Sequence, residues 1–240
     1  MTSAEVQAQA SSKMVDCEDS SLTERTVSVR TAKRCLSDTS RSTFHLRVVV
    51  SESGSMPIGK SDFGLSMDEL RVVARYAVES AQEVLHLFEE ANSEDLRPRF
   101  AIAAAWEFVH GAARTRLQRV TALDAHRAAK DVAGTAGEHA ARAAGDAAAA
   151  AYLHPMAKAT QVGHILRSAA CAARAAELSA GNNPAEGEAL IERARRRATP
   201  ALIDVLSRYP LAPAGKSRVA YLMKALWRVA LGGSASPGRW

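Results

Sequence analysis

The sequence predicts an all-α protein with one folded domain, built as a helical bundle or irregular helical array of about seven helices. Between residues 122 and 176, 23 of 55 residues are alanine, the strongest helix former. After residue 66, apolar residues recur at helical spacing, and no segment reads as a strand. Helices rich in alanine can pack at about 8 Å, the short end of the usual range. Residues 122–176 are therefore expected to form the tightly packed centre of the domain.

The first 65 residues differ in composition and are expected to be a disordered extension. Of the first 66 residues, 20 are Ser or Thr, and aromatic residues are scarce. The change in composition near Met56 predicts that the native product begins at that methionine. A phosphate-loop pattern occupies residues 54–61, but no helix follows it directly and no parallel sheet is expected downstream. Nucleotide binding is therefore not expected there.

The first two helices are marked by signals at their N-termini. Ser66 and Glu69 form a capping box, which begins a helix that ends near Ala91. Pro98 suits the first turn of a second helix, which pauses at Gly111.

Three alanine-rich helices are expected next. The first covers residues 112–131 and is expected to bury Leu117, Val120 and Leu123. The second covers residues 138–154 and is stopped by Pro155. The third covers residues 157–179 and ends before a Gly- and Asn-containing break.

The C-terminal part is basic. A sixth helix, interrupted by Pro200, carries four arginines, and a proline-containing link leads to a last helix that ends near Val229. Residues 189–240 hold ten basic and two acidic side chains. Such a surface could meet phosphates or an acidic protein, or complement the slightly acidic body of its own domain. The candidate basic surface consists of Arg193, Arg195, Arg196 and Arg197.

The domain is expected to cover residues 66–231, with residues 232–240 as a flexible tail. No apolar run is long enough to span a membrane, and no signal peptide opens the chain. The three cysteines show neither a metal-ligand spacing nor a disulfide framework. The cytoplasm is the expected location.

A polar cluster is expected within the alanine-rich centre. Histidine and carboxylate on facing helices are what a metal ion or a general acid–base pair requires. Their spacing matches no metal motif, and no nucleophile lies beside a base at a readable spacing. Three interpretations stay open: structural histidines, a partner or small-ligand site, and a metal site. No catalytic residue, cofactor or metal is predicted, and the candidate residues are His126, His139, Arg142, Asp146, His154 and His164.

Several short runs, taken in order, resemble a known family. They occupy residues 95–102, 124–129, 139–146, 151–155 and 157–165. In these runs the chain resembles bacterial, largely actinobacterial, all-helical proteins described as putative immunity proteins, over about residues 66–230. The resemblance implies a small cytoplasmic partner, without catalysis, that binds and neutralises a toxin deployed between competing bacteria. It supplies no binding residues and leaves the oligomeric state open.

A nucleic-acid-associated protein is the alternative. Chains of this kind are also described as an exonuclease subunit, and the basic C-terminal helices would then contact nucleic acid. The sequence lacks the strands, the magnesium-binding acid and the long coiled coil that such an ATPase needs. The immunity interpretation is therefore the first hypothesis, with either the histidine and arginine stripe or the basic helices as its contact surface.

Overall fold

Nine α-helices make up most of the part of the chain that the computed structural model describes, residues 63–212 and 215–230. Two 3-10 helices, η1 (Ala150–Tyr152) and η2 (Ala159–Gln161), lie between α6 (Ala136–Ala149) and α7 (Val162–Ser179), and these described ranges contain no strand. The all-α prediction is confirmed. The α-helices are α2 (Met67–Gln82), α3 (His86–Glu89), α4 (Arg97–Val109), α5 (Arg116–Asp131), α6 (Ala136–Ala149), α7 (Val162–Ser179), α8 (Pro184–Arg197), α9 (Pro200–Ser207) and α10 (Arg218–Ala230).

The helix count exceeds the expected seven because two predicted helices are each divided. The helix expected to continue to residue 91 ends at Gln82, and α3 follows after one tightened turn. The basic helix ends at Arg197, where Ala198 takes an extended conformation and Thr199 caps α9. Pro200 occupies the first position of α9, where its missing N–H removes no helical hydrogen bond.

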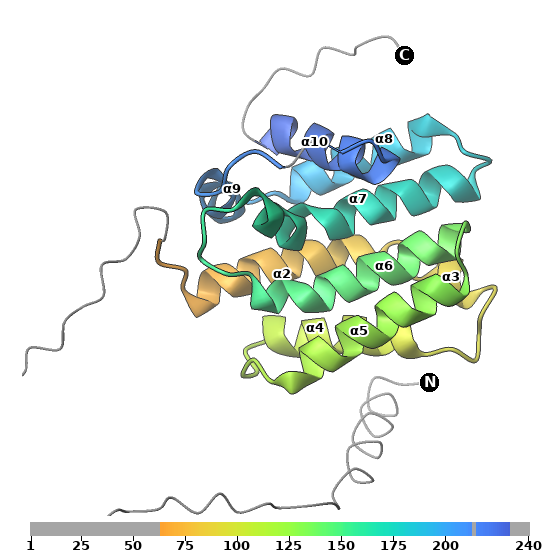
Figure 1. Cartoon of the computed structure of the whole chain (residues 1–240), viewed down its shortest axis with the longest axis horizontal. Coiled ribbons are helices and arrows are strands. Elements are labelled where there is room, and N and C mark those ends of the chain that lie inside the picture. Colours follow the sequence, from red (N-terminus) through yellow and green to blue (C-terminus); the bar gives the residue numbers. More distant parts are fainter. Residues whose placement is uncertain (1–62, 213–214, 231–240) are drawn as a thin grey trace, which may run out of the picture. The chain divides into compact units, whose positions relative to one another are not determined.

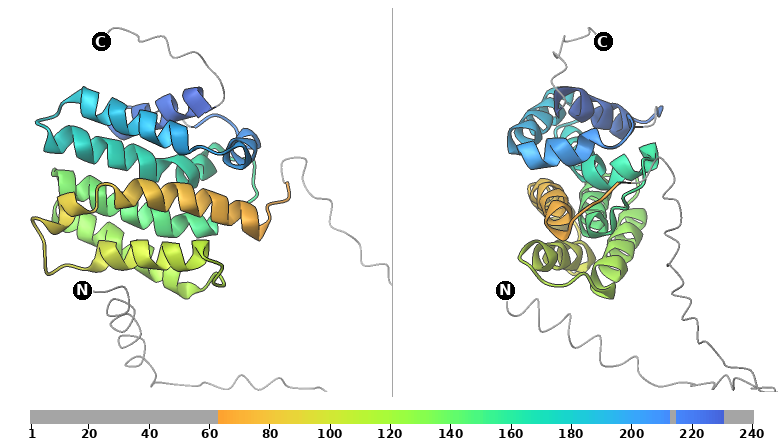
Figure 2. Two further views of the ribbon diagram at one scale, coloured as in Figure 1. Left: turned by 180° about the vertical axis from the view of Figure 1, so that it is seen from behind. Right: turned by 90° about the vertical axis from the view of Figure 1, so that its left-hand side faces the viewer.

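The helices stack in layers, as Figures 1 and 2 show. Helices α4 and α5 form one side, α2 and α6 lie in the middle, and α7, α8 and α10 form the other side. Helix α6 is the most central because it packs against α5 and α4 on one side and against α7 on the other. It is also the helix with the most uniform run of small buried residues: Ala140, Ala141, Ala143, Ala144, Gly145, Ala147 and Ala148. The expected alanine-rich centre is thus present.

The expected core of α5 is wrong in two positions. Val120 and Leu123 are 39% and 52% exposed, and Leu117 is only half-buried. The buried face instead carries small and polar residues, Gln118, Thr121, Ala122, Ala125, Ala128 and Ala129. Gln118 tolerates this position because its side chain donates to the Ala104 carbonyl (3.2 Å) and accepts from the Thr115 amide (2.9 Å). The larger apolar residues are left on the surface because the small face allows α5 and α6 to pack closely.

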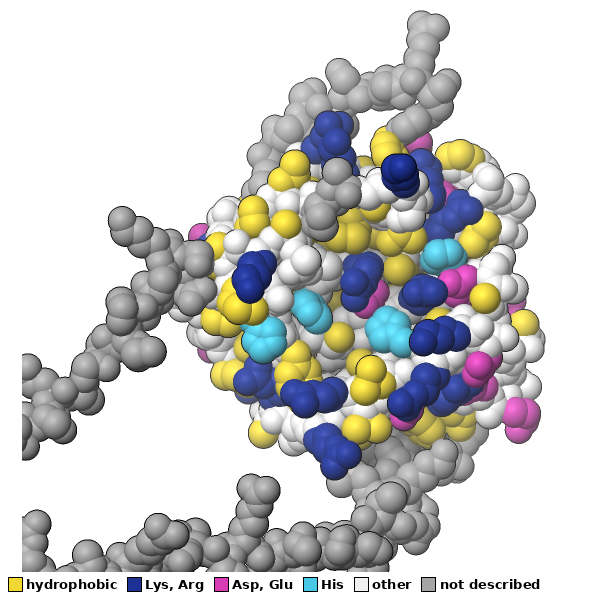
Figure 3. All heavy atoms as spheres, in the orientation of Figure 1, with side chains coloured by type: hydrophobic (Ala, Val, Ile, Leu, Met, Phe, Trp, Pro, Cys, Tyr) yellow, Lys and Arg dark blue, Asp and Glu magenta, His cyan; other side chains and the backbone are white. Residues whose placement is uncertain are grey.

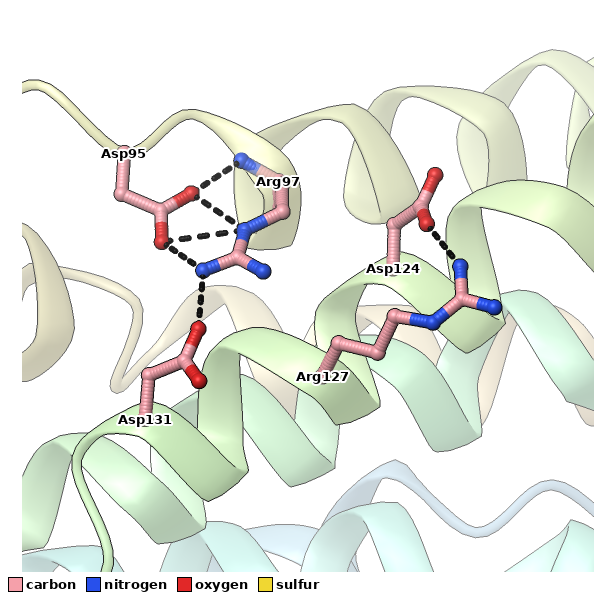
Figure 4. A network of polar contacts seen from close by, with 5 residues as sticks. All are labelled: Asp95, Arg97, Asp124, Arg127 and Asp131. Atoms are coloured by element: carbon pink, nitrogen blue, oxygen red, sulfur yellow. Dashed lines mark hydrogen bonds and ion pairs between the residues drawn. The ribbon is translucent and has the colours of Figure 1, made fainter.

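Charged side chains tie the ends of α4 and α5 together (Figure 4). Arg97, in the first turn of α4, donates to the Asp95 carboxylate and reaches Asp131 at the end of α5 at 2.7 Å. Asp124 and Arg127 form a separate 2.6 Å pair along the exposed side of α5. The Arg97–Asp131 contact joins the start of α4 to the end of α5, the helix that contributes to the candidate site described below.

Some predictions concern residues outside the described ranges. The C-terminal tail, the phosphate-loop pattern and all but residues 63–65 of the predicted extension fall there. Among those three residues, Phe63 packs edge-to-face on Tyr209, with ring centroids 4.9 Å apart. Within the described part of the chain, no helix combines the length and the apolar character needed to cross a bilayer.

Candidate functional site

A groove opens on the face formed by α5, the end of α6 and the start of α7. It encloses about 360 Å³. Figure 3 shows histidine side chains on this face, with Lys and Arg side chains more frequent around them than Asp and Glu. Helix α5 contributes Leu123 and His126 to the lining, and α7 contributes His164 and Arg167. The complete lining is Arg119, Ala122, Leu123, His126, Ala149, Tyr152, His154, His164 and Arg167.

Asp146 is buried beneath the groove and contacts two of the side chains that line it. Its side chain is 2% exposed and accepts from Arg167 Nε and Nη2 at 2.6–2.9 Å. His126 Nε2 lies 3.5 Å from the same carboxylate, so one buried acid on α6 orients side chains of both α5 and α7. Gly145 allows this approach, since a Cβ there would lie 2.9 Å from His126 Nε2 and 3.0 Å from the Ala122 carbonyl oxygen. The arrangement leaves the half-exposed Arg167 side chain at the wall of the groove.

Burial disfavours the charged form of two groove histidines, His126 and His164. Burial lowers the pKa of His126, against the nearby Asp146 carboxylate, which raises it. Burial likewise lowers the pKa of His164, and the Arg167 charge adds to that effect. His154 is exposed and follows η1, where its backbone carbonyl accepts from the Tyr209 hydroxyl at 2.9 Å. The structure thus gathers four of the predicted residues, His126, Asp146, His154 and His164, at one groove.

His139 and Arg142 belong to a different environment. Arg142 pairs with Glu138 on its own helix at 2.7 Å. His139 is half-buried, and burial lowers its pKa; the charged groups that act on it are Glu138, Arg142, Arg174 and Glu177. Neither side chain lines the groove. Helical angle alone placed His139 within about 20° of Asp146, but the two lie almost two turns apart along α6.

Three arginines at the start of α5 extend the groove. Arg114 precedes the helix, Arg116 is its first residue, and Arg119 lines the groove; all three are exposed. The guanidinium carbons of Arg114 and Arg119 lie 5.3 Å and 4.9 Å from the Tyr152 ring centroid. The Tyr152 hydroxyl donates to the Thr115 carbonyl at 2.6 Å, so the ring is fixed beneath these charges. We call the groove lining together with Arg114 and Arg116 the arginine–histidine face.

The arginines of α8 are engaged with carboxylates. Arg193 pairs with Glu83, the residue that follows α2, at 2.9 Å, and Arg197 contacts the same carboxylate and Ser80. Arg195 and Arg196 are exposed, and both pair with Glu192 one turn earlier on α8.

The chemistry of this face suits recognition. Within the ranges the structure describes, no group of three or more His, Cys, Asp and Glu is arranged to hold a metal ion. Asp146 is committed to Arg167, and the Cys171 thiol is buried with its pKa raised by desolvation. What the surface offers a partner is guanidinium groups, imidazoles and exposed apolar side chains.

Sequence reasoning missed the groups that dominate this face. Arg114, Arg116 and Arg119 were not singled out, nor were Arg167 and Tyr152. One signal was available: the first turn of a helix favours acidic residues, yet here a Thr–Gln capping box is followed by arginines. Basic residues placed against that preference point to a role other than helix stability.

The chain was compared with protein families, curated proteins and solved structures. A family model described as "Imm-5 like putative immunity protein" matches residues 65–200. This range contains the whole arginine–histidine face. No curated protein and no solved structure matches the chain.

Proposed function

Because the chain belongs to the Imm-5 like putative immunity protein family, we propose that it binds and neutralises a bacterial protein toxin through the arginine–histidine face. The action is non-catalytic and takes place in the cytoplasm of the bacterial cell that it protects. The observation that carries the proposal is an open groove in which apolar Leu123 lies beside Arg119. Arg119 and its neighbours Arg114 and Arg116 form no ion pair with a carboxylate among the described residues. Exposed apolar surface next to fixed arginine is typical of protein–protein contact sites.

The rigid support of the face favours binding over catalysis. Side chains held in place before binding lose little conformational entropy when a partner docks. Tyr152 is fixed by its hydrogen bond to Thr115, and Arg167 is fixed by Asp146. A toxin covered by this face is neutralised when the contact covers its active or cell-binding surface, without any bond being broken.

The alternative, a nucleic-acid contact through the basic C-terminal helices, receives less support. Arg193 and Arg197 already pair with Glu83, directly after α2, and Arg195 and Arg196 share Glu192 of their own helix. The Arg193 and Arg197 pairs are consistent with the interpretation in which the basic run complements the body of its own domain. The arginines at the start of α5 have no such partners among the described residues.

The test combines capture of the partner protein with a growth assay for protection against it. The tagged full chain is used to capture partners from its host after nuclease treatment and a moderate salt wash. The captured protein is then expressed in a sensitive bacterial strain. We expect growth arrest that the wild-type chain relieves. The matched variants are Arg119→Glu in the groove, which should fail to protect, and Arg196→Glu on α8, which should still protect. A captured protein that leaves growth unchanged, or arrest that the chain does not relieve, would overturn the proposal.

A further inference from the structure

We infer that the arginine–histidine face receives an acidic segment of a protein partner, in which carboxylates meet Arg114, Arg116 and Arg119 and one apolar side chain enters the groove. The inference rests on the proposed function and specifies the chemistry of the partner. Its evidence is the charge balance of the arginines, their placement in the fold and the shape of the groove.

The arginines at the start of α5 differ from most other arginines of the domain in their ion pairing. Within the described ranges, Arg114, Arg116 and Arg119 form no ion pair with a carboxylate, although they lie within six residues of one another. Most other described arginines have a carboxylate partner: Arg71, Arg75, Arg97, Arg99, Arg127, Arg142, Arg167, Arg174, Arg193, Arg195, Arg196, Arg197, Arg208 and Arg218. Of the described arginines that form no ion pair with a carboxylate, all but Arg228 therefore lie at the start of α5, beside the groove.

The placement of these arginines is the second step. The N-terminus of an α-helix carries a partial positive charge, which opposes further positive charge in the first turn. Arg116 is the first residue of α5, and no acidic residue lies in that turn. Like charges so close together also repel one another. A carboxylate supplied by a partner would relieve both effects, whereas the isolated chain has to bear them.

The shape of the groove is the third step. Its volume lies at the small end of natural ligand pockets, which suits one large side chain of a partner. Ala122, Leu123 and Ala149 provide apolar wall, and Arg119 and Arg167 stand at its polar side. Interfaces commonly centre on one such buried anchor surrounded by charged contacts.

An acidic protein segment fits better than nucleic acid. Proteins that bind single strands offer aromatic faces on which bases stack. Here the Tyr152 ring already carries the Arg114 and Arg119 guanidinium groups. The exposed apolar residues Val120 and Leu123 would also gain nothing from a phosphate backbone.

The experiment uses the isotopically labelled full chain and defined probes. A capped peptide with a phenylalanine flanked by glutamates is titrated while backbone amide NMR shifts are followed. A second peptide has alanine in place of the phenylalanine, and a short oligothymidine supplies phosphate. The groove variant is Arg114→Gln/Arg116→Gln/Arg119→Gln, and the matched control is Arg193→Gln/Arg195→Gln/Arg196→Gln on α8. Amide spectra of both variants verify folding before titration.

We expect saturable shifts of groove residues with the phenylalanine peptide and weaker binding of the alanine peptide. The groove variant should bind about tenfold less tightly, the combined effect of three exposed ion pairs, while the α8 variant binds like the wild type. Three outcomes overturn the inference: no shifts in the groove, equal binding by the groove variant, or tighter binding of oligothymidine at the same residues. Equal binding of both peptides overturns the apolar anchor.

This test and the growth test can fail separately. Peptide binding without protection would leave an acidic-segment site whose partner is not a toxin. Protection that is unaffected by the groove variant would keep the immunity function and refute this assignment of its contact surface.

Discussion

Replacing Arg116 with glutamate should stabilise the protein while it weakens partner binding. Arg116 is the exposed first residue of α5, without an ion pair among the described residues. A charge near a helix terminus contributes about 0.3–1 kcal/mol at low ionic strength. Arg116→Glu removes an unfavourable charge and adds a favourable one, so we expect a gain of about 1 kcal/mol. The substitution also removes the repulsion of residue 116 by Arg114 and Arg119, which increases the expected gain in stability.

The assay is urea unfolding followed by circular dichroism at low salt. With a slope of about 2 kcal/mol per molar urea, the midpoint should rise by about 0.5 M at an unchanged slope. The gain should shrink near 1 M salt, where the screening length falls to about 3 Å. Arg196→Glu is the matched control, because the same change in the last turn of α8 removes a favourable cation and its contact with Glu192. It should lower the midpoint. A lower midpoint for Arg116→Glu, or the same sign for both variants, would refute the reasoning.

Two further predictions concern buried groups. Gly187→Ala should destabilise the protein by about 2 kcal/mol despite the better helix propensity of alanine, because its Cβ would lie 2.6 Å from Glu177 Cγ. Gly163→Ala, whose Cβ would meet only the Arg167 guanidinium at 3.4 Å or beyond, should be neutral or slightly stabilising, and comparable urea midpoints for the two variants would contradict the packing argument. Stability should also fall on acidification from about pH 7.5 to about pH 5.5, because the pKa values of His126 and His164 are lowered in the folded state. The unfolded chain then takes up protons first, so His126→Gln/His164→Gln should show a smaller change in urea midpoint over this range, and an unchanged dependence would refute the assignment.

The sequence was sufficient for the helical fold, because helix signals are local. The capping box at Ser66 and the prolines in the first turns of α4 and α9 act on residues within one helical turn of themselves. Which face of a helix is exposed could not be predicted in this way, because it depends on how the neighbouring helices pack. Leu123 is exposed because α5 packs through alanine, and alanine is compatible with either a buried or an exposed position.

The candidate cluster was predictable only in part for the same reason. Asp146 and His164 lie on adjacent helices, and sequence grouping brought them together without showing that Arg167 binds the carboxylate. Ion pairs between distant segments, such as Arg193 with Glu83, have no sequence signature. The arginines at the start of α5 could have been recognised from the sequence, because positive charge is unfavourable in the first turn of a helix. Only the structure shows that they form no ion pair among the described residues.

The contacts of Glu177 determine how far the chain can be shortened at its C-terminus without loss of stability. This carboxylate is 1% exposed on α7 and accepts from Arg218 of α10 at 2.7 Å. Arg218 lies beyond residue 200, where the family match ends. A shortened chain that stops there would lose this cation and uncover the apolar surface against which Leu222, Leu226 and Trp227 pack. The limits of family similarity and of cooperative folding therefore differ, and the smallest autonomous folding unit should extend through α10.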